Sequence, residues 1–172
     1  MKYVALLRGI NVGKNKRLDM ATLRLVFENL GYTEVASYIN SGNIIFTTDK
    51  KINIKKIESA IAKRFGTPIP ILIKSVKAMK NIAMAIPAQW KNDTSQRTDV
   101  IYLFDDIDRK NIIADLPINK EYVDLRYVKG AVILHLWRKN YSKSRLNKLI
   151  GCPYYQSMTI RNVNTARYLA SI

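Results

Sequence analysis

The order of strand-like and helix-like patterns in the first half of the sequence constrains the fold more than any other feature. Four short apolar runs have the length and composition of β-strands, and they lie at 2–8, 34–40, 43–48 and 69–74. Apolar residues at helical spacing follow Asp19 and Asn53, which are typical N-caps, and these helices are expected to end at Gly31 and Gly66. The predicted order is therefore β-α-β-β-α-β, the order of a ferredoxin-like plait.

The second half repeats this order less clearly. Strands are predicted at 99–104, 122–128, 131–137 and 154–158, and helices from Asp108 to Ala114 and from Ser142 to Ile150. Each half has a hairpin turn that ends in glycine, Ser41-Gly42 in the first and Lys129-Gly130 in the second. We therefore predict an α+β fold of two ferredoxin-like plaits in tandem, as a duplication would produce.

Extra helices and a polar segment complete the predicted organisation. An additional helix follows Ser75, so the first subdomain is expected to span 1–86, and the irregular segment 87–97 is a candidate linker. The second subdomain is then 98–172, with a C-terminal helix that begins near Thr159. In several strands both the odd-numbered and the even-numbered residues are apolar, which is typical of strands buried on both faces. The sheet faces are therefore expected to be covered, by each other or by the extra helices, so that the subdomains pack as one unit.

The loop "RGINVGKNKR" (8–17) follows the first predicted strand and is similar to the phosphate-binding motif G-x-x-x-x-G-K-[ST]. Three residues separate Gly9 from Gly13, one fewer than the motif requires, and Asn15 stands where the motif has a magnesium-binding hydroxyl. The following helix begins near Asp19, too late to place its N-terminal amides under a phosphate. The loop therefore does not form a nucleotide site of this type.

A looser anion site is expected where the first strand and the first hairpin end. In a ferredoxin-like plait the first two strands are parallel with the third between them, so these ends meet at one edge of the sheet. The edge contains no carboxylate, and its candidate ligand-binding residues are Arg8, Asn11, Lys14, Asn15, Ser41 and Asn43. Arginine offers a fork of donors that suits phosphate or carboxylate. The alternative is that the asparagines support turns and that Arg8 pairs with the C-terminal segment.

Net charge bears on the class of ligand. The chain has 29 Lys and Arg against 13 Asp and Glu, a formal charge of +16, and no acidic residue follows Asp124. Such an excess attracts polyanions, which favours nucleic acid or a phosphorylated small molecule as a partner. The alternative is that the frequent Lys, Ile and Asn reflect AT-rich coding and that the lysines form a solvated surface.

Other chemistry has little support in the sequence. The single histidine, His135, alternates with Ile133 and Trp137 on a predicted strand, which indicates a structural role. One histidine and one cysteine are too few for a zinc site, and "DDID" (105–108) is typical of a strand-to-helix turn. The third predicted strand lacks the aromatic pattern of an RNA-recognition motif. We therefore expect no metal and no cofactor, and no catalytic residue can be assigned.

The sequence also bears on location. No apolar run approaches the roughly 18 residues of a membrane helix, and the apolar start is too short for a signal peptide. The single cysteine, Cys152, fits a reducing compartment. The protein is therefore expected to be soluble and cytoplasmic, without a membrane partner.

Three segments carry a resemblance to a known family: "YVALLRGINVGKNKRLDM" (3–20), "YINSGNIIF" (38–46) and "RNVNTARYL" (161–169). They resemble a widespread, mainly bacterial family known as domain of unknown function 1697, over essentially the whole chain. Two positions depart from the family's pattern: Lys14, where a glycine is common, and Val163, where an aromatic is frequent. The resemblance implies a two-plait α+β fold, and it implies no activity because none is established for the family.

The family's signature extends the set of candidate site residues. Carried onto this sequence, it falls on Arg8, Gly9, Asn11, Gly13, Ser41, Gly42, Asn43, Arg161, Asn162 and Thr165. It therefore adds Arg161 and Asn162 as ligand-binding candidates, in a late segment that is expected to join the edge formed by the first two.

Three functions remain open at this point. The first is non-catalytic binding of an anion, either nucleic acid or a phosphorylated small molecule, at the edge formed by the 8–15 loop and the 40–43 hairpin. The second is an enzyme acting on a phosphorylated or carboxylated small molecule, against which the lack of a spaced acid–base pair counts. The third is a structural or interaction protein whose signature residues brace the fold.

Overall fold

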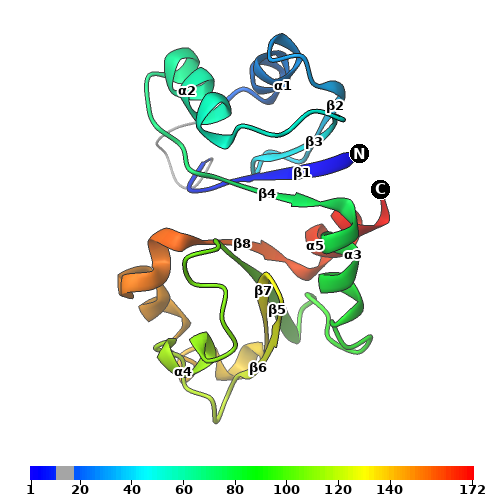
Figure 1. Ribbon diagram of the computed structural model, residues 1–172. Helices are drawn as coiled ribbons and strands as arrows, with labels where there is room; N and C mark the ends of the chain where they lie inside the picture. Colours follow the sequence, from blue (N-terminus) through cyan, green and yellow to red (C-terminus); the bar gives the residue numbers. More distant parts are fainter. Residues whose placement is uncertain (11–17) are drawn as a thin grey trace. The chain divides into compact units, whose positions relative to one another are not determined.

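The computed structural model describes residues 1–10 and 18–172, which divide into two compact units, Met1–Val76 and Lys77–Ile172. The fold is mixed α and β, with a four-stranded antiparallel sheet in each unit (Figure 1). Among the described residues, no helix combines the length and apolar character needed to cross a membrane.

The first unit is a sheet with two helices on one face (Figure 1). Its elements are β1 (Lys2–Leu7), α1 (Met20–Asn29), β2 (Thr33–Tyr38), β3 (Asn43–Thr47), α2 (Ile54–Phe65) and β4 (Ile71–Ser75). The strand order is β2-β3-β1-β4, so the proline-flanked β4 is an edge strand, as its prolines predict. Helix α3 (Val76–Met84) follows β4 directly.

The second sheet has the corresponding order, β6-β7-β5-β8. The elements of the second unit are β5 (Gln96–Leu103), α4 (Ile112–Asp115), β6 (Asp124–Val128), β7 (Ala131–Trp137), three 3₁₀ segments, β8 (Met158–Asn162) and α5 (Val163–Ser171). The 3₁₀ segments are η1 (Arg138–Asn140), η2 (Leu146–Gly151) and η3 (Pro153–Ser157). They stand where the first unit has the 12-residue helix α2.

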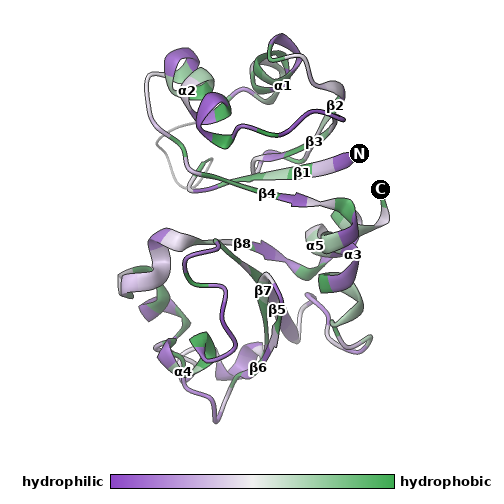
Figure 2. Ribbon diagram, viewed as in Figure 1, coloured by the Kyte–Doolittle hydropathy of each residue, from purple (hydrophilic) through white to green (hydrophobic). Residues whose placement is uncertain are grey.

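The predicted helix signals in the first unit are confirmed. The carboxylate of Asp19 accepts hydrogen bonds from the N–H groups of Ala21 and Thr22, and the Asn53 side chain accepts from Lys56 N–H at 3.0 Å. Gly66 ends α2 in a left-handed conformation, φ 69°, which glycine adopts without strain. In Figure 2 both α1 and α2 carry green and purple residues, the pattern of a helix with one face on a core.

The predicted helix from Ser142 to Ile150 is wrong, because this stretch forms 3₁₀ segments and turns. The buried Ser144 donates its hydroxyl hydrogen to Tyr141 O at 2.6 Å, and its Oγ accepts from Leu146 N–H, so its side chain competes with helical hydrogen bonds. Arg145 has φ 59°, a left-handed conformation that interrupts a helix.

Further boundaries in the second unit differ from the prediction. The proposed last strand at 154–158 lies mostly in η3, which Pro153 starts, and β8 begins at Met158. The final helix begins at Val163 rather than near Thr159. Asp108 does not cap α4, whose N-cap residue is Asn111.

Strands at the centre of each sheet are buried on both faces, as their apolar parities predict. In β1, Ala5 and Leu7 belong to the core beneath α1 and α2, while Val4 and Leu6, on the other face, are both 0% exposed. A second core lies on one face of the second sheet, with Ile101 on β5 among its residues.

The segment predicted as a linker, 87–97, is bonded to the second unit. Arg167 donates to the carbonyl oxygens of Pro87 and Trp90 at 3.2 and 3.1 Å. Arg138 donates to the carbonyl oxygen of Asp93 at 2.6 Å. Arginine side chains therefore fix the course of the chain between α3 and β5.

Candidate functional site

The chain after β1 is held on both sides where the sequence predicts an anion site. The N–H of Leu7 donates to Gly42 O at 2.8 Å, and the N–H of Arg8 donates to Pro70 O at 3.0 Å. Arg8 is half-buried. The hydrogen bonds place its backbone between the β2–β3 turn and the segment before β4, so Arg8 and the 40–43 hairpin share one edge of the first sheet, as predicted.

Gly42 brings the loop and the turn into close contact. It has φ +75°, and a Cβ built on it would lie 2.5 Å from Cδ1 of Ile10 and 2.9 Å from Cβ of Leu7. Ile10 is 4% exposed. Glycine is therefore required at position 42 for two reasons. It adopts this backbone conformation without strain, and it has no side chain that would clash with Ile10.

Asn43 braces the same turn from inside. Its side chain is completely buried, and its Nδ2 donates to Tyr38 O at 3.0 Å and to Ser41 Oγ at 2.9 Å. Ile39 in this turn has φ 49°, which for a β-branched residue carries strain of about 1–3 kcal/mol. Both N–H bonds of the Asn43 amide are thus committed to holding a strained turn.

The remaining site candidates separate into two groups. Asn11, Lys14 and Asn15 lie outside the described residues. Arg161 and Asn162 lie on β8 in the second unit, and Asn162 Oδ1 accepts from Thr165 N–H at 2.9 Å as the N-cap of α5. That the late segment joins the Arg8 edge stays a prediction.

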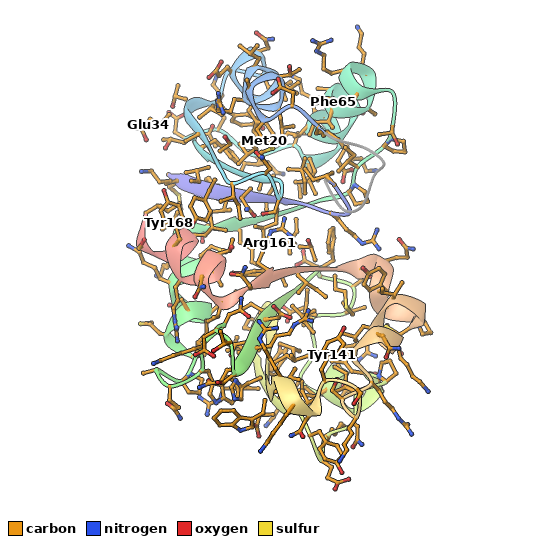
Figure 3. All side chains as sticks on the ribbon, turned by 180° about the vertical axis from the view of Figure 1, so that it is seen from behind. Met20, Glu34, Phe65, Tyr141, Arg161 and Tyr168 are labelled. Carbon is orange, nitrogen blue, oxygen red and sulfur yellow. The ribbon has the colours of Figure 1, made fainter. Side chains whose placement is uncertain are left out.

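Arg161, which is labelled in Figure 3, is a buried cation. It is 7% exposed, and its Nη1 donates to Thr159 Oγ1 and to Ile160 O, both at 2.9 Å. Burial lowers the pKa of Arg161 to about 10, against an opposing effect of Tyr102. The guanidinium therefore remains charged at neutral pH.

The second unit has backbone hydrogen bonds like those at the Arg8 edge, but its side chains there are different. The N–H of Leu103 donates to Gly130 O and the N–H of Phe104 donates to Ser157 O, both at 3.0 Å. These bonds correspond to those of Leu7 and Arg8, so Phe104 occupies the place of Arg8. The residues that follow it are the acidic "DDID" rather than a basic loop.

Asp108 of this acidic segment braces the second hairpin. Its Oδ1 accepts from Gly130 N–H at 2.9 Å and from Tyr127 OH at 3.0 Å, and Lys129 Nζ lies 3.0 Å from Oδ2. Burial acts to raise the pKa of Asp108, but the hydrogen bonds from Gly130, Lys129 and Tyr127 outweigh it and lower the pKa. The turn thus employs a carboxylate where the first hairpin employs an amide.

His135 has the structural place that its strand position predicts. It is 4% exposed and stacks on Trp90, with ring centroids 4.9 Å apart. Thr98 donates its hydroxyl hydrogen to Lys91 O at 2.8 Å, so Nδ1 of His135 donates to Thr98 Oγ1 at 2.9 Å. The histidine therefore ties the segment before β5 to the sheet.

Acid is expected to destabilise the protein through His135. Burial lowers the pKa of His135 below its ordinary value of 6.5. The unfolded chain therefore binds a proton that the native state does not, and the free energy of unfolding falls as the pH drops below about 6.5. Because the chain has one histidine, urea unfolding between about pH 6.5 and 5 isolates this effect, and His135→Gln should remove the slope. An unchanged slope in the variant would contradict the assignment.

A cavity in the second unit was not predicted from the sequence. Its volume is about 290 Å³, and its lining includes Arg97, Asp99, Leu134, Tyr141, Tyr155 and Ile160. Arg97 Nε donates to Asp99 Oδ2 at 2.7 Å, and the guanidinium carbon lies 5.5 Å from the centre of the Tyr141 ring. The cavity lies between the core face of the sheet and the 3₁₀ segments that replace a helix.

One sequence signal could have located this cavity. Arg97 and Asp99 share the parity of Ile101 and Leu103, so these four residues of β5 point to one face and two of them are charged. The predicted strand begins at Asp99 and leaves Arg97 in the predicted linker. The sequence pattern therefore does not show that both charged residues lie on one face of a strand.

The chain is similar to a protein family and to a solved structure. A model of the family DUF1697, described as a protein of unknown function, matches residues 1–133. The match confirms the expected family, and the matched region ends before Arg161. Among solved structures, the conserved bacterial protein SP0830 from Streptococcus pneumoniae has a TM-score of 0.82 and 30% sequence identity, covering 99% of this chain and 97% of that chain. No curated protein matches the chain.

Proposed function

We propose that this chain, which belongs to the DUF1697 family of proteins of unknown function, binds a phosphate group without catalysing a reaction. The proposed binding site is the sheet edge that carries Arg8. The phosphate belongs to a phosphorylated small molecule or to a nucleic-acid backbone. Arg8 supplies the charge and the donors, because a guanidinium binds phosphate through paired N–H groups. Ser41, half-buried in the adjoining turn, supplies a hydroxyl at the same edge.

The observation that carries this proposal is the fixed backbone around Arg8. The hydrogen bonds of Leu7 to Gly42 and of Arg8 to Pro70, together with Ile10 over Gly42, hold the loop entry in one place. A preorganised donor loses less entropy when it binds a ligand than a flexible one does. The net charge of +16 adds a long-range attraction for anions.

The corresponding edge of the second unit supports the assignment to the first. It places Phe104 where the first unit has Arg8, followed by Asp105 and Asp106. An acidic segment repels phosphate, so the same backbone frame is expected to bind an anion at one edge and not at the other.

The two asparagines of the candidate site that the structure describes act as braces in this proposal. Asn43 holds the turn beside Arg8, and Asn162 caps α5. Their substitution is therefore expected to reduce stability, and Asn43 is expected to affect ligand affinity through the position of the turn.

We also infer that each unit is a ferredoxin-like plait, related to the other by duplication. The matching strand orders, the matching hydrogen bonds at Leu7 and Leu103, and a helix directly after β4 and after β8 support this inference. The second unit departs from that plan where its 3₁₀ segments replace the second helix.

Substitution of Arg8 tests the proposed function. Binding of a fluorescein-labelled single-stranded oligonucleotide is measured by anisotropy at two salt concentrations, with inorganic pyrophosphate as competitor. Arg8→Gln is expected to weaken pyrophosphate binding about tenfold or more, since a hydrogen bond to a charged group contributes about 1.5–3 kcal/mol. Displacement of the oligonucleotide by pyrophosphate shows that both occupy one phosphate site, and a steep salt dependence of oligonucleotide binding indicates nucleic acid as the ligand, because several phosphates are then contacted.

The matched control is Arg64→Gln, which removes the same charge from an exposed position in the last turn of α2. It measures how much binding comes from net charge alone. Equal effects of the two substitutions would contradict a site at Arg8.

A further inference from the structure

We propose that the cavity above β5 in the second unit binds a small, neutral aromatic molecule with an amide-like edge, such as a nucleobase or an aromatic carboxamide. This site is separate from the phosphate site proposed at Arg8. Its polar end is the pair formed by Arg97 and Asp99, and Tyr141 and Tyr155 are part of its lining.

The first unit shows how the same place in the fold is filled when there is no cavity. Tyr3 lies four residues before Leu7, and Asp99 lies four residues before the corresponding Leu103. Tyr3 pairs with Phe46 across the sheet and stacks on it, with ring centroids 5.8 Å apart. The first unit therefore packs two aromatic rings into this corner of its core.

In the second unit the corresponding cross-strand pair is Asp99 and Leu134. A carboxylate and a leucine fill less space than two aromatic rings. The segment above them is 3₁₀ rather than α-helical and does not compensate for the missing volume. The space that remains is the cavity of about 290 Å³, close to the lower limit of about 300 Å³ for ligand pockets.

The charges in the cavity favour a neutral occupant. The Asp99 side chain is 10% exposed and its partner Arg97 is 34% exposed, so the two charges cancel in a partly desolvated place. An anion would be attracted by Arg97 and repelled by Asp99. A cation would be attracted by Asp99 and repelled by Arg97. Within the described chain, the bond that Asp99 receives from Arg97 uses Oδ2, which leaves Oδ1 as an acceptor.

The remaining lining selects the shape of the occupant. Ile101, Leu134 and Ile160 form an apolar floor on the sheet, on which a flat ring buries apolar area. An adjacent donor and acceptor on the ring edge match Asp99 as acceptor and the Arg97 N–H groups as donors. The volume of about 290 Å³ is sufficient for a single ring or a fused pair.

Benzamide, benzoate and toluene are the probes that test this proposal, with binding followed by amide chemical shifts of the ¹⁵N-labelled full chain. Benzamide is expected to shift the signals of Asp99 and Leu134 and to leave those of Ala5 and Ile44 in the first unit unmoved. It should bind about tenfold more tightly than benzoate and toluene, because only benzamide makes both polar contacts without a charge. Shifts elsewhere, or equal affinities for the three compounds, would overturn the proposal.

Two variants separate a ligand site from a packing defect. Leu134→Phe introduces the ring that the first unit carries at Phe46, so it should abolish benzamide binding. Asp99→Asn keeps the shape and leaves Arg97 as a net positive charge, so the preference should reverse in favour of benzoate. Benzamide binding that survives Leu134→Phe, or an unchanged order of affinities in Asp99→Asn, would overturn the proposal, and the second variant decides the matter if the first does not fold.

Discussion

Replacement of Gly42 by alanine is expected to lower the free energy of unfolding by about 2–5 kcal/mol. The left-handed conformation of this residue, φ +75°, costs an L-residue about 1–2 kcal/mol. The added methyl would lie 2.9 Å from Cβ of Leu7 and still closer to Ile10, and such overpacking costs about 1–3 kcal/mol more. Cβ of Leu7 cannot rotate away because it is fixed to a central strand. Equilibrium urea unfolding measures the sum.

Gly66→Ala is the matched control for this prediction. Gly66 has nearly the same backbone angle, φ +69°, but nothing lies within 4 Å of the position of an added Cβ. Its substitution should show the conformational contribution alone, about 1–2 kcal/mol. Equal losses at Gly42 and Gly66 would show that Ile10 does not pack on the turn as described.

Asn43→Asp is expected to have a comparable effect, with a loss in the free energy of unfolding of about 2–4 kcal/mol at pH 7. The change preserves shape but replaces an amide that donates to Tyr38 O and Ser41 Oγ with an acceptor. Each buried group left without a partner costs about 1–3 kcal/mol, and a charged group costs more. The residue is completely buried, so water cannot replace the lost bonds.

The pH dependence of this variant identifies the cause. Burial should raise the pKa of the introduced carboxyl above its unfolded value of about 3.9, so the native state binds more protons than the unfolded chain. The free energy of unfolding of the variant should therefore recover relative to the parent protein as the pH falls from 7 towards 5. Asn147→Asp, the same change at an exposed position, is the control and should show little loss. A comparable loss at Asn147 would contradict a special role for Asn43.

Local signals made much of the first unit predictable. Asp19, Asn53 and Gly66 act on the backbone within a few residues, so their meaning is visible in the sequence alone. The pairing of the Arg8 loop with the Ser41-Gly42 turn also followed, because the order of strands determines which ends meet at an edge.

The errors lie where the structure depends on burial, backbone conformation or strand register rather than on a pattern in the sequence. Ser144 and Arg145 interrupt a helix through burial and backbone conformation that no periodicity reveals. The direction of Asn43, into its own turn rather than towards a ligand, depends on how the hairpin closes. The cavity beside Asp99 depends on which residue lies across the sheet, and that pairing appears only with the register of β5 and β7.

Amide chemical-shift mapping with inorganic pyrophosphate tests the central claim, that the Arg8 edge binds phosphate, most directly. Addition of pyrophosphate to the ¹⁵N-labelled chain should shift the signals of Arg8, Gly9, Ser41 and Gly42 in a saturable manner, and Arg8→Gln should abolish these shifts while Arg64→Gln preserves them. Saturable shifts confined to the basic stretch 138–148, or shifts at the Arg8 edge that persist in Arg8→Gln, would contradict the account.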